Sequence, residues 1–310
     1  MLTSTQKRTA EAIVNIFETG EVLGDYSMVT LIAGDTGHLT YGRSQTTLGS
    51  GNLYKLLHRY CSCSGSRFGS RLSPYLPRVA SCDLSLDGEG RLHNLLRASA
   101  DDPVMRDTQD AFFDEVYWRA AARTADREGI TSALGVAVVY DSFVHGSWKA
   151  MRNRTVQNIG EPARAGERPW ISAYVETRRA WLEGHRRADL RATVYRMESF
   201  QRLMDQGYWG LELPLVVRGR EISVATLSAT PPGCYDGPQP GTRILALQSP
   251  MQRGLDVRLV QLGLSEHGVG IKADGIFGQT SARLVREYQA SNHLPPTGSV
   301  DTALIASLVA

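Results

Sequence analysis

The stretch RTAEAIVNIFETG, residues 8–20, predicts the first helix of the chain and the residue that ends it. Its apolar residues recur with the i, i+3, i+4, i+7 spacing of one buried helix face, at Ala10, Ile13, Val14 and Phe17. Ser4 or Thr5 can cap the start of this helix, and Gly20 lies where a helix commonly stops. Glu18 is therefore expected in the last helical turn, at the edge of the buried face.

Helical patterns continue through most of the chain up to residue 226. They follow a short predicted strand in SMVTLIAGD, residues 27–35. Helical spacing or length is found in six segments, at residues 53–60, 91–98, 105–124, 132–146, 170–185 and 194–207. The sequence therefore predicts a mainly α (α+β) fold with one small β element.

The composition is typical of a soluble globular protein. Of 310 residues, 42 % are hydrophobic and 21 % are charged, and the formal net charge is +2. This charge is too small to indicate nucleic-acid binding, and no apolar run has the length of a membrane span. Because the N-terminus lacks the pattern of a secretory signal, we expect a product that reaches the periplasm or cell wall by lysis, a secretion system or another route.

Four cysteines, Cys61, Cys63, Cys82 and Cys234, lack the spacing of a zinc site. We expect no metal and no organic cofactor. Free thiols are favoured, and a local disulfide from Cys82 to Cys61 or Cys63 is the alternative.

The composition changes at residues 227–242, where SATPPGCYDGPQPG is rich in proline and glycine. Such a segment is typical of a semi-rigid linker. We therefore predict a large domain at residues 1–226 and a small one at residues 243–310. In the small domain, DVRLVQLGL (residues 256–264) predicts one helix, and two glycine turns each precede another, so three helices are expected.

The small domain resembles the type 1 peptidoglycan-binding module of bacteria. The matching residues are Val257–Leu262 in the first helix, the Asp-Gly-Ile-Phe-Gly turn at Asp274–Gly278, and Tyr288-Gln289 at the end of a helix. The resemblance implies wall binding that involves Asp274, Phe277 and Tyr288. A structural appendage, or a docking domain for a protein partner, is the alternative.

Glu18 and Asp35 have the properties of an acid/base pair. The negative end of the helix dipole and apolar neighbours favour a protonated Glu18, as a general acid requires. Asp35 lies between Gly34 and Gly37, where backbone N–H groups and threonine hydroxyls can keep it ionised as a base for water. A protonated carboxylic acid and an ionised carboxylate are the pair of groups that glycoside hydrolysis requires. Ordinary helix termination followed by a turn is the alternative.

The residues around this pair resemble the catalytic signature of chitosanases of glycoside hydrolase family 46, in the wider lysozyme-like superfamily. The match is a glutamate that ends the first long helix, a tyrosine, an aspartate with a threonine five residues later, and TTLGSGN at residues 46–52. The resemblance implies a two-lobed lysozyme-like domain with Glu18 as acid, Asp35 as base, Thr40 orienting water and Tyr26 contacting substrate. It also implies inversion, with the two carboxyl groups about 6.5–9.5 Å or more apart.

A second match is VVYDSFVHG, residues 138–146, which resembles the central buried helix of that family. There an aspartate supports the acid through arginines, and Asp141 is the matching position. Because a buried aspartate without a cation is costly, we expect a network with Arg178 or Arg179 and with Arg196. A core ion pair unrelated to the chemistry is the alternative.

Further substrate contacts are expected from residues beside the turn, namely His38, Tyr41, Arg43, Gln45 and Thr46. Asn52 stands where the family has an acid for the ammonium group of the substrate. An amide instead suits a neutral N-acetylated sugar.

With the wall-binding resemblance, this predicts a bacteriolytic muramidase-type hydrolase of β-1,4 bonds in peptidoglycan. A chitosanase acting on glucosamine polymers is the first alternative, and a non-catalytic wall-binding protein is the second. The expected partner is peptidoglycan or another aminosugar polymer, and an immunity protein or secretion apparatus is left open.

Overall fold

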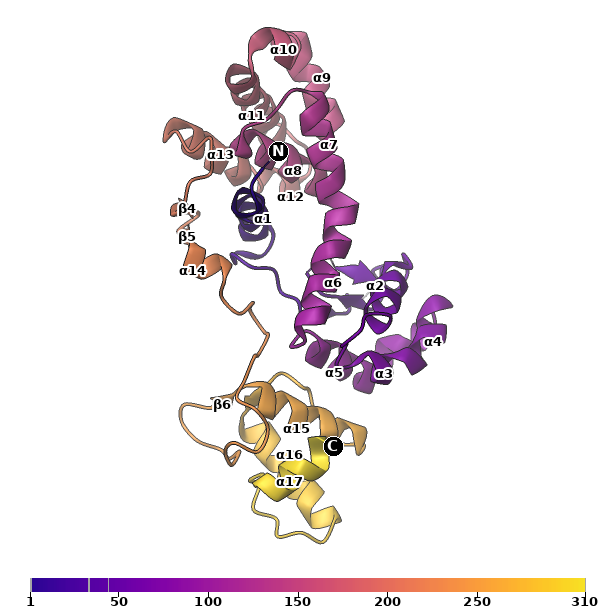
Figure 1. The fold of residues 1–310 in the computed structure, drawn as a ribbon. Helices are drawn as coiled ribbons and strands as arrows, with labels where there is room; N and C mark the ends of the chain where they lie inside the picture. The colour runs from indigo at the N-terminus through magenta and orange to yellow at the C-terminus, as the bar shows by residue number, and fades with distance from the viewer. Residues whose placement is uncertain (1, 33, 44, 310) are drawn as a thin grey trace. The chain divides into compact units, whose positions relative to one another are not determined.

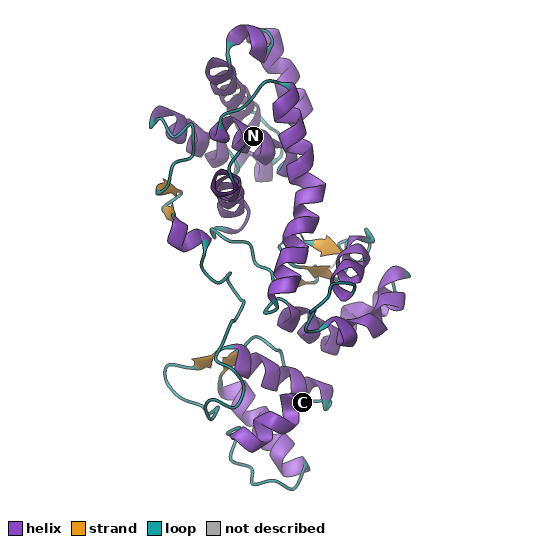
Figure 2. Ribbon diagram, in the orientation of Figure 1, coloured by secondary structure: helices purple, strands orange, loops and turns teal. Residues whose placement is uncertain are grey.

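The computed structural model describes residues 2–32, 34–43 and 45–309, which form two compact units. The first, here called the helical unit, contains Met1–Gly24 and Phe113–Ala229. The second contains Asp25–Phe112, here called the small lobe, and Thr230–Ala310. Figure 1 follows the chain through both units, and Figure 2 shows that helices dominate each of them.

The helical unit is built around α8, Ala133–Val144, which packs against α1, α7 and α11. Every residue of α8 from Ala133 to Ser142 is buried, as expected for a helix that is apolar on all sides and lies at the centre of a bundle. The other elements of this unit are α1 Ser4–Thr19, the π-helical turn Asp114–Trp118, α7 Arg119–Arg127, α9 Trp148–Ile159, α10 Pro162–Ala165, α11 Glu167–Glu183, α12 Ala188–Arg191, α13 Tyr195–Asp205, β4 Leu215–Val217, β5 Arg220–Ile222 and α14 Val224–Leu227.

Helix α1 ends as the sequence predicts. Gly20 has φ 79° and its N–H donates to the carbonyl of Ile16 at 3.0 Å, which is the left-handed C-cap that glycine favours. The N-cap is Thr3, one residue before the predicted candidates, and it forms a capping box with Gln6. The carboxyl of Glu18 is thereby fixed at the end of a helix whose other face is in the core.

The small lobe contains the small β element. Three two-residue strands, β1 Val29–Thr30, β2 Thr40–Tyr41 and β3 Thr46–Thr47, form an antiparallel sheet in that order. The helical elements of the lobe are α2 Asn52–Cys61, α3 Gly69–Leu72, the 3-10 turns Ser73–Tyr75 and Leu84–Gly88, α4 Leu76–Ala80, α5 Gly90–Ser99 and α6 Pro103–Phe113. The mainly α fold with a small β element is thus confirmed. Two further sheets of two strands each, β4 with β5 and β6 Gln252–Arg253 with β7 Ile276–Phe277, were not predicted.

The C-terminal module, residues 243–310, has the three predicted helices. They are α15 Leu255–Glu266, α16 Gln279–Ser291 and α17 Thr302–Val309, and the short strands β6 Gln252–Arg253 and β7 Ile276–Phe277 pair antiparallel. Asp301 accepts a hydrogen bond from the N–H of Leu304 at 2.8 Å, as a cap of α17 should.

Two further properties concern the cysteine thiols and the length of the apolar helices. All four cysteines are free thiols, and Cys234 is buried. Within residues 2–32, 34–43 and 45–309, no helix combines the length and the apolarity needed to cross a membrane.

Candidate active site

Glu18 begins a chain of charged side chains in the helical unit. Its carboxylate accepts a hydrogen bond from Nη2 of Arg196, on α13. Nη1 of Arg196 donates to Oδ1 of Asp141 at 2.6 Å, and Nη1 of Arg178 donates to Oδ2 of Asp141 at 2.7 Å. Asp141 and Arg178 are both 0 % exposed. The expected network of Asp141 with Arg178 and Arg196 is therefore present, and it reaches Glu18 directly.

Glu18 itself lies in more polar surroundings than the sequence argument expected. Its side chain is 44 % exposed and paired with a guanidinium, rather than enclosed by Val14 and Phe17. The apolar residues of α1 point into the core, and the carboxyl reaches away from them to solvent. The orientation of Glu18 is set by Arg196, whose guanidinium lies 5.4 Å from the ring centre of Phe17.

The charges in this network offset the cost of burial. Burial opposes ionisation of Asp141, but the adjacent charges of Arg178 and Arg196 hold the pKa of its carboxyl below the usual value. Burial, together with the two arginines, lowers the pKa of His145 to about 4. His145 is thus neutral near pH 7, and its Nδ1 accepts from Nη2 of Arg178 at 2.9 Å. Arg178 is held by groups from α8 and the residues that follow it.

Arg179 is not part of this network, so its inclusion in the prediction was wrong. It pairs with Glu183 at 3.0 Å on the exposed side of α11. Neighbouring helix residues point about 100° apart, so only one of the two arginines can face Asp141.

Asp35 lies exposed in the turn between β1 and β2 of the small lobe. Its N–H donates to the carbonyl of Ile32 at 3.1 Å, and Gly34 has φ 79°. A Cβ atom at Gly37 would come within 2.7 Å of Oδ2 of Asp35, so the glycine leaves room for this carboxylate. Thr40 follows at the start of β2, and its hydroxyl donates to the carbonyl of His38 at 3.0 Å.

Asp87 anchors this turn, although no sequence motif marks it. One carboxylate oxygen accepts from the N–H of Leu39 at 2.9 Å, and the other lies 2.8 Å from Nδ1 of His38. His38 has φ 57°, an uncommon value for a residue other than glycine. Asp87 therefore stabilises the uncommon backbone conformation of His38, which lies between Asp35 and Thr40 in the chain. His38 is positioned by this bond, and its predicted contact with substrate stays a prediction.

Replacing Asp87 by Ala is expected to lower kcat by at least about tenfold. The turn loses two hydrogen bonds to a charged group, each worth about 1.5–3 kcal/mol, and about 1.4 kcal/mol of lost positioning already corresponds to a factor of ten in rate. Asp87→Asn is the matched control, since its amide oxygen can still accept from Leu39. Initial rates on a soluble polymer test this. A D87A enzyme with the parent's kcat would show that the turn does not depend on this anchor.

Tyr26 and Arg43 form a second fixed group in the small lobe. The hydroxyl of Tyr26 donates to Asp110 at 2.6 Å, and Arg43 pairs with the same carboxylate and donates to the Tyr26 oxygen at 3.2 Å. Burial raises the pKa of Tyr26 well above its usual value. Tyr26 is buried, which contradicts its predicted contact with substrate. Its hydroxyl instead helps to position Arg43 and Asp110.

Two further predicted sugar contacts are contradicted by burial. Tyr41 is in the core of the small lobe, with its hydroxyl 3.0 Å from that of Ser99. Thr46 is also buried, and its hydroxyl donates to the carbonyl of Tyr41 at 3.0 Å. Successive side chains of a strand point to opposite faces of the sheet. The side chains of Tyr41 and Thr46, which are paired in the sheet, lie on its buried face. Gln45 is exposed, so a contact from it stays a prediction.

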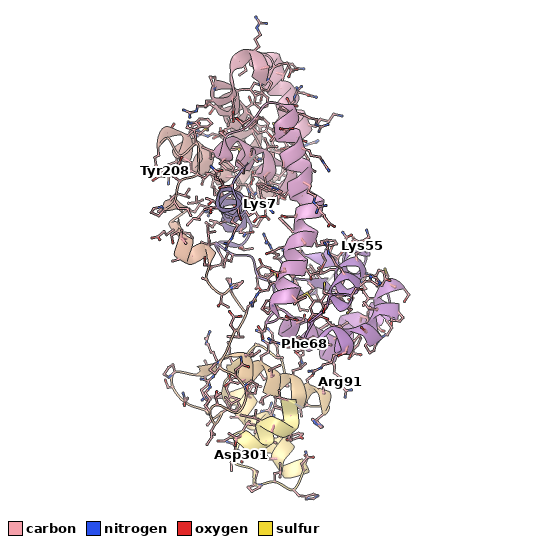
Figure 3. The ribbon with its side chains drawn as sticks, viewed as in Figure 1. Lys7, Lys55, Phe68, Arg91, Tyr208 and Asp301 are labelled. Atoms are coloured by element: carbon pink, nitrogen blue, oxygen red, sulfur yellow. The ribbon has the colours of Figure 1, made fainter. Side chains whose placement is uncertain are left out.

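Asn52 is the first residue of α2 and is half-buried. Its Oδ1 lies 3.4 Å from Nζ of Lys55, an exposed side chain on the same helix that is labelled in Figure 3. The position where the family resemblance expects an acid is thus occupied by an amide beside a cation.

The three predicted wall contacts have largely structural roles in the C-terminal module. Phe277 is buried in its core, which contradicts a direct contact with a polymer. Asp274 accepts from Gln261 at 3.0 Å and from the N–H of Ile276 at 2.9 Å, so it builds the glycine turn. Tyr288 is half-buried and packs against that core and His267.

Comparisons with known proteins identify the family of this chain. Residues 12–215 match the model of glycosyl hydrolase family 46, and residues 253–308 match the model described as "Putative peptidoglycan binding domain". A chitosanase of Bacillus subtilis (strain 168) is 26 % identical over 239 residues, which cover 71 % of this chain and 84 % of the relative.

Solved structures give the same result. A native chitosanase from Bacillus subtilis MY002 has a TM-score of 0.57 at 25 % identity, over 71 % of this chain and 96 % of the other. A chitosanase from Gynuella sunshinyii, solved with chitotetraose, has a TM-score of 0.57 at 26 % identity, over 72 % and 99 %. Because the family model matches from residue 12 to residue 215, this chain belongs to glycosyl hydrolase family 46.

Proposed function

We propose that this glycoside hydrolase cleaves β-1,4 bonds of chitosan, with Glu18 as general acid and Asp35 as general base. The observation that carries the proposal is the chain of contacts from the helix-end Glu18 through Arg196 to the buried Asp141. The named relatives are chitosanases, and one of them is solved with chitotetraose, which supports chitosan over the peptidoglycan that the sequence alone favoured.

In this mechanism Glu18 protonates the glycosidic oxygen as the bond to the leaving sugar breaks. Asp35 takes a proton from the water that attacks the anomeric carbon, and the configuration inverts. The hydroxyl of Thr40 donates to a backbone carbonyl, which leaves its oxygen lone pairs to accept a hydrogen bond from that water. Arg196 fixes the direction of the Glu18 carboxyl, and Asp141 and Arg178 fix Arg196.

Peptidoglycan is the second candidate, and a specific observation favours it. Asn52 is neutral and lies beside Lys55, a setting that repels the ammonium group of glucosamine. The match to a peptidoglycan-binding domain at residues 253–308 points to the same polymer. Turnover of fully deacetylated chitosan, partly N-acetylated chitosan and purified sacculi, with mass spectrometry of the products, separates the candidates. Turnover of sacculi with none of chitosan would overturn the proposal.

Asn52→Asp is expected to raise kcat/KM on fully deacetylated chitosan by about tenfold, because an added carboxylate gains about 1–2 kcal/mol with a nearby ammonium group at low salt. Asn292→Asp, which alters an amide at the end of α16 in the module, is the matched control. Equal gains on glucosamine and N-acetylated polymers would mean that Asn52 does not contact the amino group.

A further inference from the structure

The C-terminal module is packed against the small lobe through one face of α15 and the loop at residues 271–275. Leu262 belongs to the same buried cluster as the core of the small lobe, and Leu259 packs against that cluster. Helix α15 lies along α5. An apolar side chain that completes the core of its neighbour is characteristic of a permanent contact rather than an encounter between tethered domains.

Asn94, on α5, uses its whole amide group to hold the module. Its Nδ2 donates to the hydroxyl of Ser265 at 2.9 Å and to the carbonyl of Ile271 at 2.7 Å, and its Oδ1 accepts from the N–H of Ala273 at 2.9 Å. These three bonds are fully buried. Such an arrangement requires the loop at residues 271–275 in one fixed register against α5.

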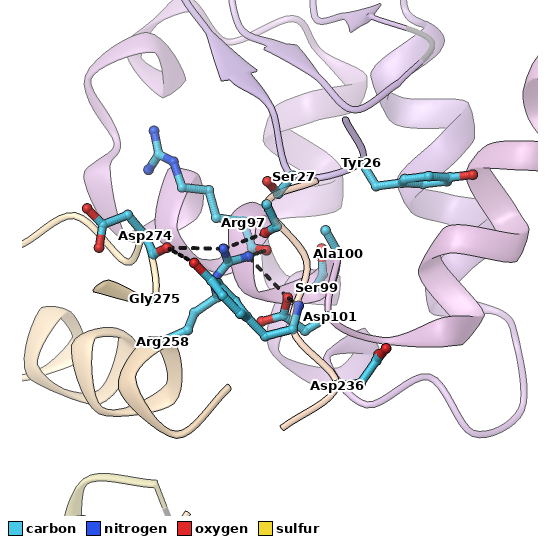
Figure 4. Close-up of polar contacts among 12 residues, drawn as sticks. Tyr26, Ser27, Arg97, Ser99, Ala100, Asp101, Asp236, Arg258, Asp274 and Gly275 are labelled. Carbon is cyan, nitrogen blue, oxygen red and sulfur yellow. Dashed lines mark hydrogen bonds and ion pairs between the residues drawn. The ribbon is translucent and has the colours of Figure 1, made fainter. Parts of the chain in front are cut away.

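Arg258, on α15, joins three segments of the chain, as Figure 4 shows. Its guanidinium donates to the carbonyls of Arg97 and Gly233, both at 2.6 Å, and to Oδ1 of Asp101 at 3.2 Å. Only 2 % of its side chain is exposed. Burial raises the pKa of Asp101 to about 7 in spite of Arg258, so near neutral pH the contact depends on the carbonyl bonds as much as on charge.

The proline-rich segment, predicted as a linker, is attached to the same face. The N–H of Tyr235 donates to Oδ1 of Asp101 at 2.8 Å, and Asp236 pairs with Arg106 at 2.9 Å. Cys234 is buried in a cluster with Tyr26 and Ala100 of the small lobe. Residues 234–236 therefore follow the surface of the lobe and do not act as a free tether.

We propose that the C-terminal module is a docked, not a tethered, polysaccharide-binding domain, built into the body that carries Asp35. Its polymer is then held at a fixed place on the small lobe, whereas a tethered module would only raise the local concentration of substrate. The fixed placement of the polymer rests on the proposed function, whereas the docking of the module does not.

The module also has a groove that lies outside the docked face. A groove of about 650 Å³ is lined by residues of α16, α17 and the segment between them, together with Ile244. It shares no residue with the docked face formed by Arg258, Leu259, Leu262, Ser265 and the 271–275 loop.

Alkylation of Cys234 in the full-length chain, mapped by peptide mass spectrometry, tests the docking without reference to activity. In the parent protein Cys234 is expected to react far more slowly than Cys61 and Cys63, which are partly exposed. Asn94→Ala is expected to speed labelling of Cys234 by about tenfold or more, since three buried hydrogen bonds are lost. Chymotrypsin should also cleave after Tyr235 faster in that variant.

Arg258→Ala repeats the test from the module side, and Arg283→Ala, which removes an exposed i,i+4 pair with Glu287, is the matched control. Rapid labelling and cleavage of the parent itself would show that the module is tethered and would overturn the proposal.

The proposed effect of docking on activity has a separate test. Asn94→Ala should lose activity on insoluble polymer but keep it on short soluble oligomers, and unchanged activity on both would refute a role of docking in catalysis.

Discussion

Replacing Glu18 by Gln is expected to lower kcat by about 10²–10⁴-fold, the usual contribution of a general acid. The amide has the size of the carboxyl and can still accept from Arg196, but it has no proton to give to the glycosidic oxygen. KM should change little, because Arg196 and the surrounding fold remain. Release of reducing ends from soluble chitosan, measured under saturating substrate, gives the effect.

Glu21→Gln is the control for this substitution. Glu21 is an acid just beyond the C-cap of α1, and it pairs with Arg220 near the surface at 2.9 Å. It should keep the activity of the parent. If Glu18→Gln and Glu21→Gln were equally active, Glu18 would not be the acid. If the parent had no activity on any aminosugar polymer, the chain would be the non-catalytic wall-binding protein.

Asp141→Asn is expected to destabilise the helical unit by about 3–5 kcal/mol, the cost of leaving one partner of a buried ion pair without its counter-charge. Arg178 and Arg196 would both stay buried with a neutral amide between them. Urea unfolding monitored by tryptophan fluorescence measures the change. Asp189→Asn, which breaks an exposed pair with Arg187, is the control and should leave the urea midpoint close to that of the parent.

The carboxyl of Asp141 also affects how the stability of the parent protein depends on pH. Although burial opposes its ionisation, the pKa of Asp141 is lower in the folded protein than the usual value of an aspartate, because of the adjacent charges of Arg178 and Arg196. A group with a depressed pKa contributes its stability above the unfolded pKa and loses it as the pH falls through the folded one. The difference in stability between the parent and Asp141→Asn should therefore be full at pH 6–7 and shrink below about pH 4. A constant difference down to pH 3 would contradict this assignment.

Asp141→Asn should also lower activity at temperatures where the variant is still folded. Without the carboxylate, Arg196 loses one of the two bonds that direct it toward Glu18. A variant that is destabilised but has the parent's kcat would show that Asp141 serves the core alone, which is the alternative that the sequence left open.

Several features were predictable because they depend on short stretches or on large local energies. The end of α1 at Gly20 follows from helix periodicity and from the preference of glycine for positive φ. The partners of Asp141 follow from the cost of burying an uncompensated charge. The three helices of the module follow from its repeated glycine turns and caps.

Other features depend on contacts between distant parts of the chain. Asp87 reaches His38 across 49 positions, and Asn94 reaches Ile271 across 177. Neither residue has a local pattern that marks it, because a polar side chain on a helix or turn is usually solvated. The choice of Arg178 over Arg179 likewise depends on how α11 packs against α8.

Local sequence patterns were enough to predict the helical class, the two candidate carboxylates and a charged network around Asp141, because periodicity, helix termination and charge burial act locally or carry a large free-energy cost. The burial of Tyr41 and Thr46, the anchoring of the turn beside Asp35 by Asp87, and the docking of the C-terminal module on the small lobe required the folded structure. These depend on which surfaces meet. Many pairings of surfaces differ by only a few kcal/mol, and local sequence patterns do not distinguish them.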